Sequence, residues 1–425
     1  MLGHLVILQT AAASVTAVVR PLSAIQLLGE GRRKFLHGLC TNDINNLALD
    51  GVLDASVVDA SGRLTDLITV VDRPEALVAF TAPEGRGAEL CQSFDRYAFP
   101  ADRVTVEDVT GTFGCACEIS GVGAAALLAD ALEVPTEQLP RTGCAASLCS
   151  SLSPSPVLVL GSGSLGFEDE EVYSILGPSA DASDDDSGLI AMLLAAVREA
   201  GGAVEASYER MRVQRGRPAR GYEYGRAGGA KEDAPTPLEL GLWSSVHLDK
   251  GCYMGQEVLA RLARVKKPKK ALYGIRFDAS DHAAAPLEAG ATVEVEGEGG
   301  GGGEDAGGGD LLSAARSPVA GVLTSVVVDP KTNVPMYGLA MVQPSRAAVG
   351  SRVTVAAGVA AGEVVEIEAA TRFGAQAGGG LEPSATTEVD ASAQAAAVAA
   401  SAAEAERKKK KLEAMAQRMK DLGLA

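Results

Sequence analysis

The sequence is poor in aromatic residues, which make up 4% of its 425 residues and include a single tryptophan, Trp243. Since 47% of the residues are nevertheless apolar, the core must consist mainly of Ala, Val and Leu side chains. At about 150 residues per domain, the length predicts two or three structural units and excludes a minimal binding module.

Basic residues are also in short supply. Lys and Arg total 38 against 55 Asp and Glu, so the formal net charge is −17 at pH 7. A field of this sign repels phosphate backbones unless basic side chains cluster locally, so we expect no duplex nucleic acid as a main partner. One local cluster could accept an anionic partner, but we interpret it as a solvated loop between domains. It consists of Lys266, Lys267, Lys269 and Lys270.

The cysteines and histidines lack the spacing of metal ligands. The seven cysteines contain no C-x-x-C pair, and the four histidines form no H-E-x-x-H or paired pattern. We therefore expect no built-in metal site. An odd, unpatterned set of cysteines suits a reducing compartment better than a disulfide framework.

No apolar run is long enough to cross a bilayer. Four polar residues interrupt the segment Leu5–Val19, so we expect no membrane helix. The first 29 residues contain no acidic residue and one arginine, Arg20, which is compatible with an organelle-targeting segment over residues 1–21. An ordinary first strand with a ragged start is the alternative.

The chain divides by composition into a long mixed region, a β-rich region and a tail. Residues 22–270 interleave helical and strand-like segments irregularly, unlike a βαβ repeat, which predicts an α+β region. Short β-runs over residues 271–370 predict a small barrel, interrupted by a flexible glycine-rich acidic insert at 297–309. Residues 371–425 form a low-complexity, Ala-rich tail, either a lone helix or disordered.

Two glycine patterns resemble the dinucleotide-binding fingerprint, and neither has its context. Gly121-Val122-Gly123 is not followed by a second parallel strand with an acidic end about 20 residues later. After Gly161-Ser162-Gly163, the helix that would hold a pyrophosphate at its N-terminus is missing. We interpret both patterns as tight turns.

The segment LELGLWSSVHLDKGCYMGQEVLARLAR, Leu238–Arg264, concentrates unusual chemistry around Cys252. The ammonium of Lys250 could lower the pKa of the Cys252 thiol, and Gly251 between them lets a ligand or backbone approach closely. The alternative is that Cys252 is a buried, inert small hydrophobe. We interpret Trp243 as an apolar side chain that packs beneath this segment.

Three residues that follow Cys252 extend its chemistry. Tyr253 offers a ring for stacking together with a hydroxyl, and Gln256 and Glu257 supply an amide and a carboxylate. Such a set can grip a flat heterocycle whose edge carries both donors and acceptors. Alternatively, Gln256 and Glu257 merely begin a helix.

The motif KGCYMGQE, Lys250–Glu257, resembles the K-G-C-Y-x-G-Q-E signature of the YgfZ/GcvT-like folate-binding family, relatives of the glycine-cleavage aminomethyltransferase. The segment FLHGLCTNDI, Phe35–Ile44, is similar to the family's F-L-x-x-x-x-T-N-D segment. MRVQRGRP, Met211–Pro218, is similar to its L-R-x-x-x-G-x-P segment. The resemblance covers approximately residues 22–370.

The resemblance implies a clover-leaf α+β fold, in which two α+β subdomains surround a tetrahydrofolate cleft that a C-terminal β-barrel closes. The cysteine in the signature is similar to that of the branch whose members support assembly or repair of iron–sulfur enzymes. The implied cofactor is tetrahydrofolate or a one-carbon derivative, and the implied partners are iron–sulfur client or assembly proteins. The surrounding sequence resembles chloroplast members most, with mitochondrial members as the alternative.

The resemblance also assigns roles to residues outside the signature. Asn42, Asp43 and Asp66 are expected to line the cleft as hydrogen-bond partners, or else to cap a helix and form turns. Arg212 is expected to pair with the glutamate tail of folate, or else to be a solvated helix charge.

Two departures from the aminomethyltransferases argue against true aminomethyl transfer. Their pair of Asp residues is reduced to Thr65-Asp66, and the position of a pterin-binding glutamate carries Gln214, whose amide cannot accept two hydrogen bonds in the same way. The first hypothesis is therefore a folate-binding accessory factor for iron–sulfur proteins with Cys252 as its functional thiol. A one-carbon transferase using Asp66 as acid or base, or a scaffold with a degenerate cleft, are the alternatives.

Overall fold

The computed structural model divides the chain into two compact units, Met1–Ala375 and Gln376–Ala425, and every residue that it describes belongs to the first. The described residues are 15–82, 85–150, 156–161, 171–178, 188–225, 234–265, 268–278, 287–296, 319–356 and 358–365. Several predicted features lie outside them: residues 1–14 of the targeting segment, the insert at 297–309, the tail at 371–425, Lys266, Lys267 and Gly163.

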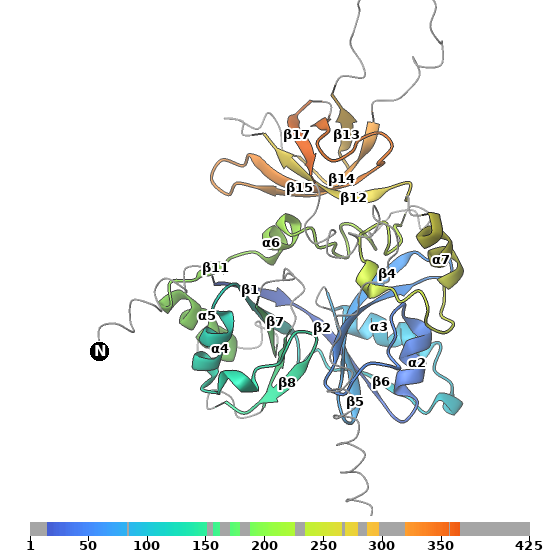
Figure 1. Cartoon of the computed structure of the whole chain (residues 1–425), viewed down its shortest axis with the longest axis vertical. Helices are drawn as coiled ribbons and strands as arrows, with labels where there is room; N and C mark the ends of the chain where they lie inside the picture. The colour runs from blue at the N-terminus through green and yellow to red at the C-terminus, as the bar shows by residue number, and fades with distance from the viewer. Residues whose placement is uncertain are drawn as a thin grey trace, which may run out of the picture. The chain divides into compact units, whose positions relative to one another are not determined.

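An antiparallel sheet of five strands forms the first part of the fold (Figure 1), with strand order β3-β4-β5-β2-β6. Its strands are β2 (Ser23–Leu28), β3 (Val52–Val58), β4 (Leu64–Asp72), β5 (Ala76–Thr81) and β6 (Thr105–Asp108). Every residue of β5 is buried, because strands flank it on both sides and helices α2 (Arg32–Leu39) and α3 (Arg86–Asp95) pack against the sheet. A short 3-10 helix, Pro100–Asp102, follows α3.

A second, six-stranded sheet has the order β11-β1-β7-β10-β9-β8. Its strands are β1 (Thr16–Pro21), β7 (Cys115–Ser120), β8 (Ala145–Leu148), β9 (Val157–Leu160), β10 (Val172–Gly177) and β11 (Ala203–Glu205). Only the β1–β11 pair is parallel. The Ala-rich helix α4 (Ala124–Leu132) and helix α5 (Leu189–Glu199) pack against each other and against this sheet, and a 3-10 turn, Thr136–Gln138, follows α4.

The C-terminal strands close into a barrel in the order β12-β15-β14-β13-β16-β17. They are β12 (Ala271–Phe277), β13 (Thr292–Val295), β14 (Val319–Val328), β15 (Pro335–Val342), β16 (Arg352–Val355) and β17 (Ala360–Val365). Its core is mostly small aliphatic side chains, Val and Ala above all, as the low aromatic content requires. The expected α+β fold with a small C-terminal barrel is confirmed.

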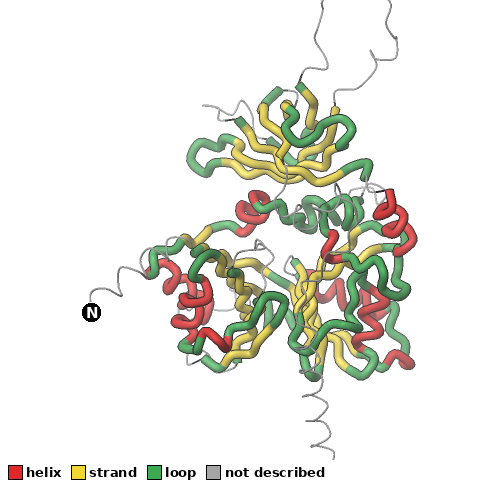
Figure 2. Tube along the Cα trace, in the orientation of Figure 1, coloured by secondary structure: helices red, strands yellow, loops and turns green. Residues whose placement is uncertain are grey.

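Three further elements connect these parts (Figure 2). Helix α6 (Tyr208–Gln214) contacts β1 of the second sheet and β14 and β15 of the barrel. The 3-10 turn Trp243–Ser245 contacts β3, and helix α7 (Gln256–Val265) follows the signature motif. No helix among the described residues is long and apolar enough to cross a membrane.

The glycine patterns serve as turns where the structure describes them. Gly121 and Gly123 both have positive φ, and Gly123 precedes the first residue of α4. Strands β8 and β11 are additions to the sequence-based expectation. They span four and three residues, too few for a clear alternation of apolar and polar positions.

Candidate functional site

The signature motif is anchored to helix α2 through Lys250. Its ammonium donates hydrogen bonds to the backbone carbonyls of His37, Cys40 and Asn42, at 2.5, 2.8 and 2.8 Å. These carbonyls lie at the C-terminal end of α2, where unpaired acceptors and the helix dipole favour a cation. Burial lowers the pKa of Lys250. The side chain must nevertheless be charged, because only the ammonium form can donate all three hydrogen bonds.

Tyr253, Gly255 and Gln256 shape the turn between Lys250 and α7. The ring of Tyr253 lies 4.9 Å from the Lys250 ammonium, a cation–π contact, and its backbone N–H donates to Oε1 of Gln256 at 3.0 Å. Gly255 has a φ of +78°, and a Cβ there would lie 2.5 Å from the carbonyl oxygen of Asp59 in the β3–β4 turn. The signature motif is therefore held in place by contacts with α2 on one side and with the β3–β4 hairpin on the other.

Cys252 is exposed, although its neighbours are held in place. The alternative that Cys252 is buried is thus wrong. Glu257 is exposed as well, at the start of α7. Trp243 packs with Leu259 and Tyr253 in a small apolar cluster beneath the motif, as expected.

Asn42 and Asp43 are largely occupied by protein contacts. The Asn42 amide donates to the carbonyls of Asp54 and Ser244, at 2.7 and 3.0 Å. Asp43 accepts from the backbone N–H and the side-chain amide of Asn46, at 3.3 and 2.7 Å. Burial of Asp43 opposes ionisation, but the hydrogen bonds from Asn46 outweigh it and lower the pKa of Asp43. Asp43 therefore stabilises a local turn, whereas Asn42 bonds to segments that are distant in the sequence.

Asp66 is fully buried in β4, with both carboxylate oxygens engaged. Oδ1 accepts a hydrogen bond from the Thr81 hydroxyl, and Oδ2 accepts one from Nε of Arg86 at 2.7 Å. Burial raises the pKa of Asp66, although Thr81 and Arg86 work against that rise. Its proposed role as acid or base would require one of these partners to move.

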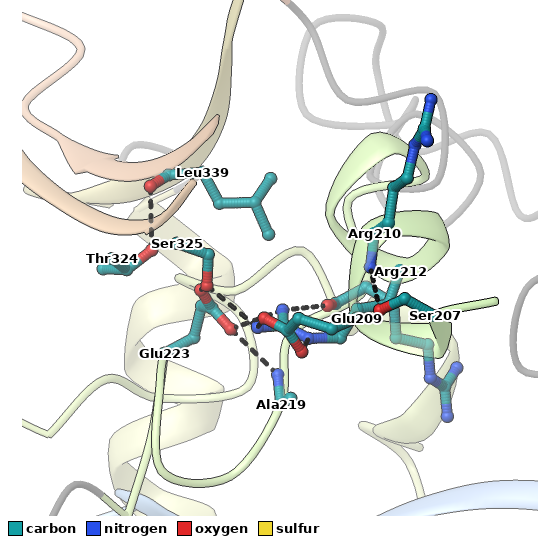
Figure 3. A network of polar contacts seen from close by, with 10 residues as sticks. Ser207, Glu209, Arg210, Arg212, Ala219, Glu223, Thr324, Ser325 and Leu339 are labelled. Carbon is teal, nitrogen blue, oxygen red and sulfur yellow. Dashed lines mark hydrogen bonds and ion pairs between the residues drawn. The ribbon is translucent and has the colours of Figure 1, made fainter. Parts of the chain in front are cut away.

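Arg212 is also fully buried, so it is not a solvated helix charge. Figure 3 shows the network of polar contacts around it. Its guanidinium donates to Glu209 from its own helix, to Glu223 at 2.9 Å, and to the Ser325 hydroxyl of β14 at 2.9 Å. It also lies 4.6 Å from the centre of the Tyr222 ring. The tail of a folate would have to displace a carboxylate to reach it. Gln214, at the end of the same helix, is exposed.

A second polar cluster, missed by the sequence reasoning, joins the two sheets. Arg20 of β1 lies 3.1 Å from Glu118 of β7 and 5.6 Å from the centre of the Tyr208 ring. Asp54 of β3 is close enough to act on the charge of Arg20, and it pairs with Arg217 at 3.2 Å. The 3.1 Å contact with Glu118 is made by Nε of Arg20, which is buried. The sequence signal that could have identified this cluster is Arg20, a charged residue that is buried in β1.

Eight of the ten predicted site residues fall into three groups, and the other two, Gln214 and Glu257, are exposed. The signature group holds Asn42, Asp43, Lys250, Cys252, Tyr253 and Gln256. Asp66 belongs to an ion pair with Arg86, and Arg212 to a network with Glu223 and Ser325. Within the described residues, no group of three or more His, Cys, Asp or Glu side chains has metal-binding geometry.

No family model matches the chain. A putative chloroplastic transferase of Arabidopsis thaliana is 29% identical over 282 residues, which cover 64% of this chain and 57% of that protein. The tRNA-modifying protein YgfZ of Colwellia psychrerythraea is 25% identical over 255 residues, covering 59% and 68%. The glycine cleavage system aminomethyltransferase T of Bartonella henselae has a TM-score of 0.59 at 18% identity, over 85% of this chain and 87% of that chain. The chain is similar in sequence to these two proteins and in fold to the aminomethyltransferase.

The likeness to the Bartonella aminomethyltransferase confirms the expected GcvT-like fold. Two of the three segments that carry the family resemblance form one structural unit, because Lys250 of the KGCYMGQE motif bonds to carbonyls in the FLHGLCTNDI segment. The third segment supplies α6 and Arg212, which reach the barrel. The chain spans little more than half the length of its Arabidopsis relative.

Proposed function

We propose that this protein is a tetrahydrofolate-binding accessory factor that supports the assembly or repair of iron–sulfur proteins, with Cys252 as its functional thiol. One observation carries the proposal most directly. Lys250, Gly255 and Gln256 each make a close contact within the protein that fixes the signature loop. Cys252, in contrast, is exposed to solvent. A fixed loop that presents a cysteine to solvent suits a thiol that acts on a partner or ligand.

The polar cluster between the sheets offers a folate a second set of groups besides the residues nominated from the motifs. Asn42, Lys250, Asp66 and Arg212 already bond within the protein. Arg20 is paired with Glu118, and the side chain of Asp54, which accepts from Thr69 and Arg217, remains 24% exposed. With Tyr208 and Arg217, these groups offer a ring, donors and a carboxylate to a heterocycle carrying both donors and acceptors.

Tetrahydrofolate, when bound, would supply a one-carbon carrier. The chain's own groups would bind and orient it: Asp54 would accept from the amino and ring N–H groups of the pterin, and Arg217 would hold the Asp54 carboxylate in place. Tyr208 would offer its ring face. Tyr253, Gln214 and Glu257 remain candidates for contacts at the edge of the ligand.

Binding of tetrahydrofolate is tested by isothermal titration calorimetry. We expect the wild-type chain to bind, and Asp54→Asn to weaken binding at least about tenfold, the loss expected when a charged hydrogen bond is removed. Asp278→Asn is the matched control, because Asp278 is an exposed ion-paired aspartate of the barrel region. Absence of binding by the wild type would instead select the scaffold with a degenerate cleft.

The thiol role is tested by rescue of a strain that lacks its own family member. We expect Cys252→Ser to fold and to fail in rescue, whereas Cys149→Ser, which changes another exposed cysteine, should rescue fully. Iron–sulfur enzyme activity in the rescued strain is the readout. Full rescue by Cys252→Ser would contradict the proposal. We place this function in the chloroplast, as the name of the Arabidopsis relative suggests, and nothing supports the mitochondrial alternative.

A folate-dependent one-carbon transferase is the second candidate, favoured by the raised pKa of the buried Asp66 carboxyl. A carboxyl whose pKa is raised by burial holds its proton more readily than an exposed one, which suits acid–base work. Turnover of methylene-tetrahydrofolate by the wild type, lost in Asp66→Asn, would support it. No turnover by the wild type removes this candidate.

A further inference from the structure

A cavity of about 510 Å³ opens between helix α2 and the segment that connects α3 to β6. Its volume lies within the usual range of small-molecule sites. The side of α2 contributes Lys34, Phe35 and Gly38, and the connecting segment contributes Tyr97 and Phe99. None of these side chains takes part in the contacts of the signature loop described above.

Two close backbone contacts fix the connecting segment against the start of α2. A Cβ on Gly29 would lie 2.1 Å from the carbonyl oxygen of Arg103, and a Cβ on Gly31 would lie 1.8 Å from that of Asp102. Both positions therefore exclude any side chain, and the two backbones meet directly. Arg103 also pairs with Glu30 at 2.8 Å across the same junction. The two walls of the cavity are thus held in a fixed relation to each other.

Two rings at the cavity are exposed, in a chain whose aromatic content is only 4%. Tyr97 is 44% exposed and Phe99 is 67% exposed, whereas Phe35 is nearly buried. The backbone N–H of Phe99 donates to Oδ2 of Asp102 at 2.9 Å, which holds the backbone that carries this ring. Large apolar side chains that are exposed together mark binding surfaces, because a ligand that covers them removes their apolar area from water.

Gly38 keeps the α2 side of the cavity open. No heavy atom lies within 4 Å of a Cβ added at this position, so a side chain would find open space there. Glycine is the least favourable residue inside a helix apart from proline, so helix formation does not explain its presence in α2. Because Gly38 lines the cavity, a larger side chain at this position would fill part of it.

Lys34 supplies a positive charge that the protein itself does not use. Of the three consecutive cations at the start of α2, Arg32 donates to two backbone carbonyls and Arg33 pairs with Asp72. Lys34 is exposed, and its ammonium makes no hydrogen bond or ion pair with the residues that the structure describes. Since the helix dipole disfavours a cation in the first turn, Lys34 does not serve the stability of α2.

The other charged groups of the cavity are engaged within the protein. Arg103 and Glu30 pair with each other, and Asp102 accepts the hydrogen bond from Phe99. The combination that remains is an unpaired ammonium beside two exposed rings. Such a combination selects a ligand that joins a flat apolar group to a negative charge.

We propose that this cavity binds a small aromatic carboxylate. The ring of the ligand packs against Tyr97 and Phe99 in the space that Gly38 leaves open, and its carboxylate accepts a charged hydrogen bond from Lys34. The inference does not depend on the proposed function. The connecting segment leads into β6, which lies at the opposite edge of the sheet from β3, the strand that carries Asp54.

Isothermal titration calorimetry of the full-length chain with three naphthalene derivatives tests the inference. The probe 2-naphthoate carries a carboxylate, 2-naphthol is neutral, and 2-naphthylmethylammonium is a cation. We expect the wild type to bind 2-naphthoate with a Kd of about 1 mM or tighter, and the other two at least about tenfold more weakly. The inference is overturned if 2-naphthoate does not bind, or if either of the other probes binds as tightly.

The role of Lys34 is tested by Lys34→Gln, which should weaken 2-naphthoate binding about tenfold because the carboxylate loses its cation. Lys331→Gln is the matched control, since Lys331 is an exposed lysine of the turn between β14 and β15, and it should leave the affinity unchanged. Wild-type affinity in Lys34→Gln would contradict the proposal.

Gly38→Leu tests the place of binding without threatening the fold, because leucine favours a helix and meets no neighbouring atom near its Cβ. It should weaken 2-naphthoate binding at least about tenfold by filling the cavity. Gly111→Leu is the control, since Gly111 is exposed and also has open space around an added Cβ. Tetrahydrofolate should not displace 2-naphthoate from the wild type. Wild-type affinity in Gly38→Leu, or displacement by tetrahydrofolate, would overturn the inference of a separate site here.

Discussion

Lys250 and Cys40 are 210 positions apart in the sequence, yet the Lys250 ammonium donates a 2.8 Å hydrogen bond to the Cys40 carbonyl at the end of α2. With the parallel bonds to His37 and Asn42, this contact makes one unit of two motifs that the sequence presents separately. The lysine therefore acts on the backbone of α2, whereas the sequence suggested that it acts on the neighbouring thiol.

Replacing Lys250 by methionine should destabilise the protein by about 2–3 kcal/mol, because three partly buried carbonyls lose a charged donor. The free energy of unfolding from urea titrations measures this. Lys270→Met is the control, since Lys270 is exposed at the start of the barrel region, and it should change stability by less than about 0.5 kcal/mol. Equal losses of unfolding free energy in the two variants would mean that the contacts of Lys250 with α2 do not stabilise the protein.

The ion pair between Arg212 and Glu223 should be the most sensitive polar contact of the fold. Both side chains are fully buried, and Ser325 of the barrel donates to Glu223 at 2.6 Å. Arg212→Met leaves the Glu223 charge buried without its partner and should cost about 3–5 kcal/mol of unfolding free energy.

The control for Arg212 is Arg276→Met, which breaks an ion pair with Glu363 at the barrel surface. Arg276 is 62% exposed, so solvent screens that pair and the cost should stay below about 1 kcal/mol. The double variant Arg212→Met with Glu223→Gln should be more stable than the sum of its single changes, because it no longer buries a lone charge. Additivity of the two substitutions would contradict this account.

The order of the elements was predictable wherever apolar spacing was regular. The hairpin around Gly62, the helices α2 and α5, and the barrel strand β12 follow directly from their sequences. Composition also predicted a core of small aliphatic residues, which the barrel core has. Short edge strands such as β11 were not predictable, because their formation depends on a neighbour that is distant in sequence, here β1.

The site was predictable in its motifs and only partly in its contacts. The exposed Cys252 could be singled out from eight residues, but the use of Lys250, Asn42 and Arg212 by the protein itself depends on segments that meet only in the fold. The ion pair of Asp66 with Arg86 is a contact of the same kind, between β4 and α3. Sequence spacing carries no information on such long-range partners.

The lowered pKa of His37 predicts a pH-dependent stability. Below an unfolded value of about 6.5 the unfolded chain binds this proton more readily than the folded chain, so stability falls as the pH drops from 6.5 toward the folded pKa. Unfolding free energies measured between pH 5 and 7 should therefore rise with pH, and His37→Gln should flatten that slope. A slope unchanged in His37→Gln would show that other groups cause it.

The close approach of Gly255 to the β3–β4 turn predicts a substitution that moves the signature loop. Gly255→Ala places a methyl group 2.5 Å from the Asp59 carbonyl oxygen at a φ of +78°. Gly221→Ala isolates the backbone part of this effect, because Gly221 has a φ of +89° with nothing within 4 Å of an added Cβ. Strain at positive φ alone costs about 1–2 kcal/mol, so Gly221→Ala should lose that much.

Gly255→Ala should lose a further 1–3 kcal/mol or so, the usual range for a forced steric overlap in a packed site. Since relief of the clash must shift the loop that carries Cys252, the alkylation rate of Cys252 should also change in Gly255→Ala and stay unchanged in Gly221→Ala. Equal stability losses and equal alkylation rates in the two variants would mean that the loop does not depend on its packing against the hairpin. Because Lys250 fixes the other end of the same loop, Lys250→Met should alter the alkylation rate in the same way as Gly255→Ala, while Lys270→Met should not.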